Sequence, residues 1–580
     1  MSLAQQPAVH YKLGMSKPST HIYEVEVTID HISKEEKQVD FILPVWRPGR
    51  YMVLDFAGGV LEFSAVDAKG KNLEWHKVEK SLWRVESKGV SAVTVRYKVY
   101  ANEFNLRTRG LNDEHGFVDG AAVFMYVEKY RALPVVLNVE PYKNWHVTTG
   151  LEGKGKTFKA PNYDYFVDCP LEIGTQKDFT FEVEKIPHVL SIYGNGNWNA
   201  DTLTRDLTKI IKTTKELFGD FPYKRYVFLL HCAPNSGGGT EHVNSTIMGT
   251  RPFVFNNPDS YRGFLSLVSH EYFHTWNVKQ FRPNGITPYD FTKENYTGEL
   301  WIAEGTTSYF DEVILVRAGL KSADKHLESI ASMIQSDRQR PGNKSQSLFE
   351  SSFDAWVKHA RGTPQAYNTE TDYYDRGAAV SMLLDLEIRQ RTKNTGSLDG
   401  VMKTLYRQFP LGGDGYTVLD FKNIVEKISG TDFTQFFNDY VSGTQPLPWE
   451  QTLSHCGLTV ALKDSAEKPW TGLSTSDTDG RTRVTRVISG SPAYEVGLDV
   501  GDEIVSLNGM RARSSDLNDR IAELKKGDSV TLLIFRNDFL KEFKLIIANQ
   551  QALNYKVYRV SSPDDLQKSI YEQWLATSWK

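Results

Sequence analysis

Apolar and polar residues alternate with a period of two along the first third of the chain. Clear cases are residues 22–29 and 92–100, where successive side chains would point to opposite faces of a sheet. Glycine-containing turn clusters at 67–70 and 150–155 separate such runs. The pattern predicts an all-β N-terminal domain over residues 1–180.

The middle of the chain changes to a helical period. Apolar residues recur there at steps of three and four, which predicts helices at 199–218, 261–280, 300–316, 322–335 and 378–392. The 261–280 segment is apolar on most sides, as expected for a helix buried inside a large domain. We therefore expect a mostly α-helical domain over 181–448, which begins with a few strands and closes on a proline-containing linker at 443–448.

Short strands with one helix return near the C-terminus. Residues 483–488, the glycine-rich segment 497–509, a helix at 516–525 and a strand at 529–535 follow one another in an order that resembles a bacterial-type PDZ domain. We assign residues 449–550 to it, and Gly472-Leu473 is the nearest match to a carboxylate-binding loop. The tail at 551–580 is too short for a domain and is expected to dock as a strand and a helix. The predicted fold class is thus multidomain α+β.

Composition narrows the class of protein. A chain of 580 residues is long enough for three or four domains, and a net charge of −4 gives no reason to expect nucleic acid as a partner. Three widely spaced cysteines support neither a disulfide framework nor a cysteine zinc site. The first residues lack a signal sequence, and no run approaches the roughly 18 apolar residues of a membrane span. We expect no membrane association and a cytoplasmic location; a secreted or periplasmic form whose signal peptide has been removed stays an alternative.

The most informative motif is His270-Glu271-Tyr272-Phe273-His274, an HExxH sequence within a predicted helix. Histidines at i and i+4 share one helical face, so both imidazoles can bind the same cation. The glutamate between them can take a proton from a water activated by that cation. These are the components of a zinc hydrolase; two incidental histidines on a core helix are the alternative.

Catalytic zinc usually has three protein ligands, so a third residue is required. The candidate is Glu304, in the predicted apolar helix at 300–316. A carboxylate buried there without a partner would cost several kcal/mol, and a metal ion is one natural partner. A first-turn glutamate stabilised by the helix dipole is the alternative.

HExxH followed by Trp301-Ile-Ala-Glu304-Gly resembles the gluzincin metallopeptidases, in particular their aminopeptidases. The 29 residues between His274 and Glu304 exceed the usual spacing of the aminopeptidase N branch, and the insertion at 280–297 reads as a loop. The longer spacing and the PDZ-like module are similar to the glycyl aminopeptidase family. The resemblance implies a thermolysin-like catalytic domain, one zinc ion per chain, and a preference for N-terminal glycine or alanine.

A glycine-rich segment, Gly237-Gly238-Gly239-Thr240-Glu241-His242, resembles the G-x-M-E-N element of aminopeptidases, with Thr240 and His242 at the usual Met and Asn positions. The resemblance implies that the backbone of Gly238 and Gly239 pairs with an extended substrate and that Glu241 holds the free α-amine. A glycine loop with a solvated glutamate is the alternative.

Tyr374, in Tyr373-Tyr374-Asp375-Arg376-Gly377, matches the tyrosine of the aminopeptidase Y-E-K-G element. That resemblance implies that its hydroxyl donates a hydrogen bond to the oxyanion of the tetrahedral intermediate. Adjacent Tyr373 is the alternative donor. A purely structural tyrosine at a helix start is the other alternative.

Together these residues predict a zinc aminopeptidase with Glu271 as general base and peptides with a free N-terminus as substrates. Two alternatives stay open: a gluzincin endopeptidase or small-substrate hydrolase, and a PDZ-type peptide-binding protein with a vestigial metal site. The PDZ groove would take a peptide end or an intramolecular ligand.

Overall fold

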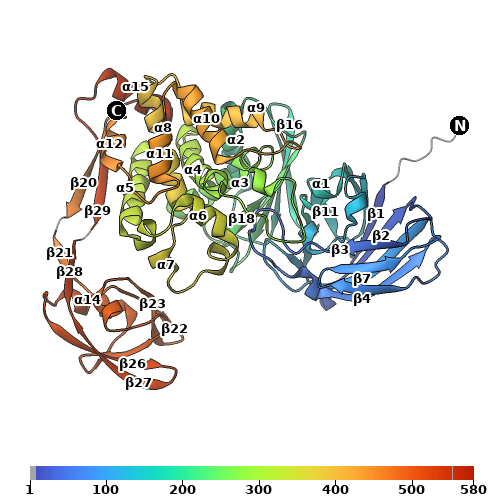
Figure 1. Cartoon of the computed structure of the whole chain (residues 1–580), viewed down its shortest axis with the longest axis horizontal. Helices are drawn as coiled ribbons and strands as arrows, with labels where there is room; N and C mark the ends of the chain where they lie inside the picture. Colours follow the sequence, from blue (N-terminus) through green and yellow to red (C-terminus); the bar gives the residue numbers. More distant parts are fainter. Residues whose placement is uncertain (1–7, 465, 552, 580) are drawn as a thin grey trace. The chain divides into compact units, whose positions relative to one another are not determined.

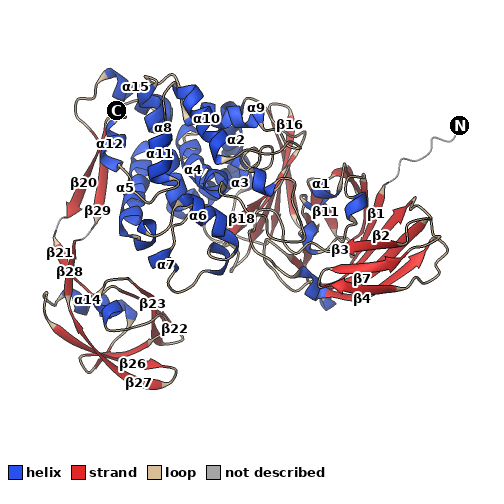
Figure 2. Cartoon of the chain, in the orientation of Figure 1, coloured by secondary structure: helices blue, strands red, loops and turns tan. Residues whose placement is uncertain are grey.

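The computed structural model describes residues 8–464, 466–551 and 553–579, which form two compact units. The first holds residues 8–297, 310–321 and 399–424; the second holds the remaining described residues. Strands dominate the N-terminal part and the C-terminal domain, whereas helices dominate between them (Figure 2). This confirms the predicted multidomain α+β class. Residues 1–7 of the predicted N-terminal domain, and residues 465, 552 and 580, lie outside the described residues.

Three sheets, in which most strand pairs are antiparallel, make up the N-terminal β region. Alternating apolar residues such as Tyr23, Val25 and Val27 are buried there. The largest sheet has the order β12 (Glu152–Lys154), β13 (Thr157–Ala160), β10 (Val135–Glu140), β1 (Val9–Gly14), β2 (Ile22–Asp30), β7 (Ala92–Tyr100), β4 (Val60–Asp67). A second has the order β3 (Gln38–Ile42), β6 (Leu82–Glu86), β5 (Trp75–Glu79), and a third has the order β11 (His146–Thr149), β14 (Leu171–Gly174), β9 (His115–Val118), β8 (Arg109–Leu111). The short helix α1 (Tyr163–Val167) follows β13.

A mixed five-stranded sheet follows in the same unit. Its order is β15 (Lys177–Val183), β16 (Ile186–Tyr193), β17 (Tyr226–Cys232), β19 (Ser245–Thr250), β18 (Gly238–Glu241). Strands β16, β17 and β19 are parallel, and β18 pairs antiparallel with β19 at the edge of the sheet. The glycine-rich segment is therefore an edge strand.

The register of this sheet assigns its side chains to two faces, because directly paired residues share a face. Gly239 pairs with Met248 and Glu241 pairs with Thr246, so these residues lie on one face. His231 pairs with both Tyr193 and Gly249, which places it on the other. Helix α3 (Pro258–Phe273) contacts β18 and β19, and Figure 1 shows it beside this sheet.

Helices form most of the chain between residues 298 and 454, and α2 and α3 precede this region. Helix starts carry capping side chains: Asn199 precedes α2, Asn257 precedes α3 and Ser322 precedes α5. The helices are α2 (Ala200–Phe218), α4 (Thr306–Arg317), α5 (Ala323–Gln339), α6 (Leu348–Phe353), α7 (Ala366–Thr369), α8 (Asp375–Arg391), α9 (Leu398–Gln408), α10 (Val418–Ser429), α11 (Thr434–Tyr440) and α12 (Trp449–Ser454). Among the described residues, none of the helices is long and apolar enough to cross a bilayer.

The C-terminal domain, which the sequence predicts to be PDZ-like, has a sheet with five strands in sequence-adjacent order, a sixth short strand at its side, and two helices around its own apolar core. Its order is β22 (Leu473–Thr478), β23 (Arg481–Val487), β24 (Glu503–Leu507), β26 (Ser529–Arg536), β27 (Phe539–Ile546), with β25 (Met510–Arg511) beside β24. The helices are α13 (Pro492–Glu495) and α14 (Ser514–Ala522).

Two antiparallel strand pairs lead into and out of the PDZ domain (Figure 1). Strand β20 (Leu458–Asp464) pairs with β29 (Asn554–Arg559), and β21 (Glu467–Trp470) pairs with β28 (Ala548–Gln551). The tail then forms α15 (Asp565–Leu575), where the buried Trp574 donates a hydrogen bond from Nε1 to the Tyr309 hydroxyl at 2.8 Å. The tail is thus packed as a strand and a helix.

Candidate metal and peptide-binding site

Helix α3 ends at Phe273, not at Gln280 as the apolar pattern predicts. The chain beyond it turns back on itself: Val278 has φ of 102°, a region that a β-branched residue rarely enters. The Asn277 carbonyl accepts a hydrogen bond from His274 Nδ1 at 2.9 Å. If the helix continued, the Asn277 carbonyl would point along the helix axis and could not accept this hydrogen bond. The early end of α3 therefore fixes the orientation of the His274 imidazole.

Both imidazoles of the motif are oriented through their Nδ1 atoms. His270 Nδ1 lies 3.2 Å from Asp311 Oδ2, and His274 Nδ1 is bound to the Asn277 carbonyl. The two Nε2 atoms then face each other at 3.1 Å. This is the arrangement in which metal-binding histidines use one nitrogen for the ion and the other for an orienting partner.

Glu304 lies in a π-helical turn, Trp301–Gly305, that continues directly into α4. Such single π turns are rare and occur frequently at functional sites. One ligand atom from each of His270, His274 and Glu304 lies within 4.8 Å of the others. Two imidazoles and one carboxylate are a donor set that fits zinc in a catalytic site.

Asp311 follows Glu304 by seven residues, two turns along the same helical segment. Its carboxylate also accepts a hydrogen bond from Ser266 Oγ at 3.1 Å. Burial raises the pKa of Asp311, and its hydrogen bond with His270 opposes that rise. Asp311 therefore links the HExxH helix to the segment that carries Glu304.

Glu271 lies against the glycine-rich edge strand. A Cβ atom on Gly239 would lie 2.6 Å from Cγ and Cδ of Glu271, closer than real contacts allow. The Arg107 guanidinium donates a hydrogen bond to the Gly239 carbonyl at 3.1 Å. Glycine at 239 is thus the residue that allows the carboxylate of the motif to approach this strand.

Glu241 shares that face of β18 with Gly239 and is only 4% exposed. Gly49, at φ of 83°, packs against it: a Cβ there would lie 2.6 Å from both carboxylate oxygens. Lys279 Nζ lies 3.9 Å from Glu241 Oε1. The expectation of a solvated loop glutamate therefore does not describe Glu241, which is enclosed and has a cation nearby.

Lys279, the cation near Glu241, belongs to a buried ionic network. Lys279 Nζ donates a hydrogen bond to Asp168 Oδ1 at 2.9 Å, and His242 Nδ1 lies 3.1 Å from the same atom. Burial alone would raise the pKa of Asp168, but Lys279 and His242 outweigh it and hold this pKa well below its usual range. Burial lowers the pKa of His242, with Asp168 opposing that change. Asp168 is therefore ionised and Lys279 is its cation.

The two adjacent tyrosines differ in their surroundings. Tyr373 is buried, and its hydroxyl lies 3.3 Å from His359 Nδ1. Tyr374 is half-buried at the start of α8, where its backbone N–H donates to Asp372 Oδ1. The two tyrosines therefore differ in burial, and the enclosed Tyr373 has its hydroxyl beside His359.

Sequence reasoning missed several residues of this site. The sequence analysis does not identify Asp311 as the partner of the His270 imidazole. The seven-residue step from Glu304 to Asp311 was a usable signal, since such residues share a helical face. Gly49 and Asp168 carried no local signal because they are distant in sequence.

The PDZ domain contacts the segment before α8. Asn368 Nδ2 donates to the Val487 carbonyl at 2.8 Å, and Ser489 N–H donates to Asn368 Oδ1 at 3.0 Å. The Arg486 guanidinium stacks 3.9 Å over the Tyr367 ring. These contacts are made by the end of β23 and the residues just after it. None of these three contacts involves β22, the edge strand that follows the predicted carboxylate-binding loop.

Models of known protein families match the N-terminal β region, the helical region and the C-terminal domain. Residues 10–175 match the Peptidase M61 N-terminal domain, residues 263–380 match M61 glycyl aminopeptidase, and residues 469–547 match a PDZ domain. No curated protein matches the chain significantly.

The likeness to solved structures extends in one case over nearly the whole chain, and two more distant matches cover about three quarters of it. An aminopeptidase N family protein from Idiomarina loihiensis is 28% identical, with a TM-score of 0.91 over 98% of this chain and all of that one. An M1 zinc metallopeptidase from Deinococcus radiodurans is 14% identical, with a TM-score of 0.48 over 77% of this chain and 97% of that one. Yeast LTA4 hydrolase in complex with bestatin is 10% identical, with a TM-score of 0.46 over 77% and 68%.

Proposed function

Because the chain belongs to the M61 glycyl aminopeptidase family, we propose that it removes single residues from peptides with a free N-terminus, using one zinc ion. His270, His274 and Glu304 hold the ion, with Asp311 and the Asn277 carbonyl orienting the two imidazoles. When bound, zinc supplies Lewis acidity, which lowers the pKa of water and polarises a carbonyl.

Glu271 is the general base. It takes a proton from the attacking water and passes it to the amine that leaves. Its position against Gly239 supports this role, because the backbone of β18 is where an extended substrate would lie.

Tyr374 donates a hydrogen bond to the oxyanion that forms on the scissile carbonyl. Removal of such a donor costs roughly 3 kcal/mol of transition-state stabilisation. Tyr374 is the residue of the pair that matches the tyrosine of the aminopeptidase Y-E-K-G element, and it is the half-buried one.

The observation that carries the proposal is the shared face of Gly239 and Glu241. Residues two apart in a strand are separated by roughly 6.7 Å. Glu271 of α3 lies against Gly239, so this carboxylate and that of Glu241 lie over the same face of β18, at neighbouring positions of that face. A carboxylate at this position binds the α-amine and limits cleavage to the first residue.

Small N-terminal residues, glycine or alanine, are the proposed substrates. The match of residues 263–380 to M61 glycyl aminopeptidase supports this preference. The PDZ groove is proposed to bind an extended peptide end by strand addition at β22.

The test compares hydrolysis of glycyl and alanyl chromophoric amides with that of their N-acetylated forms. Wild-type protein, Glu271→Gln and Glu241→Gln are each loaded with zinc and assayed. We expect cleavage of free-amine substrates only, loss of turnover in Glu271→Gln, and a large fall in kcat/KM in Glu241→Gln.

Equal cleavage of acetylated and free substrates would remove the amine-binding role of Glu241 and favour an endopeptidase. No turnover of any substrate by the zinc-loaded wild type would favour a peptide-binding protein instead.

A further inference from the structure

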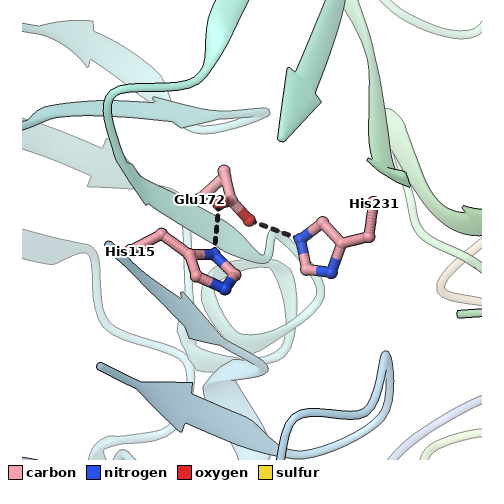
Figure 3. A group of neighbouring side chains, drawn as sticks. All are labelled: His115, Glu172 and His231. Atoms are coloured by element: carbon pink, nitrogen blue, oxygen red, sulfur yellow. Dashed lines mark hydrogen bonds and ion pairs between the residues drawn. The ribbon is translucent and has the colours of Figure 1, made fainter. Parts of the chain in front are cut away.

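A second cluster of metal-ligand side chains lies in the first unit: His115, Glu172 and His231 (Figure 3). His115 Nδ1 lies 2.8 Å from Glu172 Oε1, and His231 Nε2 lies 2.7 Å from Glu172 Oε2. Figure 3 shows the carboxylate between the two imidazoles, one oxygen toward each ring. All three residues are at least nine-tenths buried.

The cluster is separate from the HExxH site. Gly239 and Glu241 lie on the face of the five-stranded sheet that Glu271 contacts, and His231 lies on the opposite face. His115 and Glu172 come from β9 and β14 of the four-stranded sheet. The apolar residues Phe117 of β9, Val227 and Leu229 pack in one core cluster, so the two sheets meet face to face at this point.

The three residues offer a chemically coherent donor set. The ligand atoms lie within 4.8 Å of one another, and imidazole with carboxylate oxygen suits zinc and similar divalent ions. The Glu172 carboxylate is only 1% exposed, in a site where an unpaired charge would be costly.

Surrounding groups fix the ligands in place. Tyr193 stacks on the His115 ring at a centroid distance of 3.5 Å, and its hydroxyl donates to Glu114 Oε2 at 2.8 Å. Gly174, paired with His115, has no room for a side chain, because its Cβ would lie 2.9 Å from the His115 Cβ. Such outer contacts pre-orient a ligand and raise metal affinity.

A further buried polar atom lies on the same face of the five-stranded sheet as His231. Ser191 shares the His231 face of the sheet, one row away, because it pairs with Leu229. Its Oγ is buried and has no hydrogen-bond partner among the described residues. A buried hydroxyl in this state commonly marks an ordered water or ion nearby.

We propose that His115, Glu172 and His231 bind a second divalent metal ion of the zinc class, which ties β9 and β14 to β17. The ion is structural: it joins the N-terminal β region to the sheet that carries Glu241 and contacts α3. The competing arrangement is a metal-free triad, in which two neutral imidazoles donate hydrogen bonds to the Glu172 carboxylate.

Metal content of the purified full chain tests the proposal. The double variant His270→Ala/His274→Ala removes the proposed catalytic ion, so a metal ion that it retains must be held elsewhere. We expect about two ions per chain in the wild type, about one in this double variant, and none when Glu172→Gln is added. The glutamine has the size of glutamate but lacks its charge.

A folded double variant that is metal-free after dialysis with zinc would overturn the proposal, as would a Glu172→Gln protein that keeps two ions. These results are distinguishable from failure of the proposed catalytic site, in which the wild type and the His270→Ala/His274→Ala variant would hold equal amounts of metal.

Two further readouts do not depend on Glu172→Gln folding. Cobalt(II) bound to the double variant should give the visible absorption of a site with nitrogen and oxygen ligands only. Chelation of the double variant should lower its thermal midpoint, and zinc should restore it, because a ligand of the folded state stabilises that state. Absence of both effects would overturn the proposal and favour the metal-free triad.

Discussion

Gly239 and Glu271 occupy one space: the carboxylate of the glutamate fills the position that a Cβ on the glycine would need. One residue belongs to the edge strand β18 and the other to α3, at a separation of 32 positions in the sequence. The proposed general base and the proposed substrate-binding strand are therefore fitted to each other by the absence of a single methyl group.

Gly239→Ala should lower kcat by about 10²-fold, because displacing a reacting group by roughly 1 Å can cost that much. Gly237→Ala is the matched control, since a Cβ at Gly237 meets no atom within 4 Å. Steady-state kinetics on a glycyl amide checks both. Equal activity of the two variants would show that Glu271 does not need this close approach.

Asp311→Asn should weaken zinc binding by about 10- to 100-fold, because the imidazole of His270 loses its charged partner. Competition with a chelator of known affinity measures the change. Glu312→Gln, on the next residue of α4, is the control and should leave the zinc affinity unaltered. A normal zinc affinity in Asp311→Asn would remove the orienting role.

Lys279→Met should destabilise the protein by about 3–5 kcal/mol, because it leaves the buried Asp168 carboxylate without its cation. Urea unfolding measures the loss. The double variant Asp168→Asn/Lys279→Met should recover part of it, since both charges are then absent. A double variant as unstable as the sum of the single variants would mean that the two residues act independently.

Glu387→Gln should make stability less dependent on acid pH. The hydrogen bond from His455 lowers the pKa of Glu387, although burial opposes this, and Arg391 adds to the lowering. A carboxyl whose pKa is lower in the folded state stabilises it above the unfolded value, roughly pH 4.3, and loses that effect as pH falls through the folded value. The difference in thermal midpoint between wild type and variant should therefore shrink below about pH 4.

The exposed Glu35, changed to glutamine, is the control for that measurement, and its curve should follow the wild type. A Glu387→Gln difference that stays constant from pH 7 to pH 3 would contradict the assignment.

The sequence was sufficient for the elements whose periodicity is strong. The strands at residues 22–30 and 92–100 and helix α2 follow the predicted patterns, and the i, i+4 spacing of His270 and His274 brought their Nε2 atoms together as expected. Periodicity failed at the end of α3, because Trp276 continues the apolar pattern where the backbone has already turned.

Other parts of the site could not be predicted locally. Gly49 precedes Glu241 by 192 residues, and Lys279 lies in a segment whose pattern indicated helix. Their contact with Glu241 depends on how distant segments pack, which no local pattern records. The cation beside Glu241 is the most consequential of these, because under the proposed function it would compete with the substrate amine for the same carboxylate.

The paired strands on either side of the PDZ domain have one further consequence. Since β20 pairs with β29, and β21 with β28, the domain is inserted into a hairpin and its two ends lie side by side. A module attached in this way can be exchanged for another whose termini are adjacent, and the helical host keeps both strands of the hairpin. The architecture thus offers a position at which the C-terminal domain can be replaced while the residues of the candidate metal site are left unchanged.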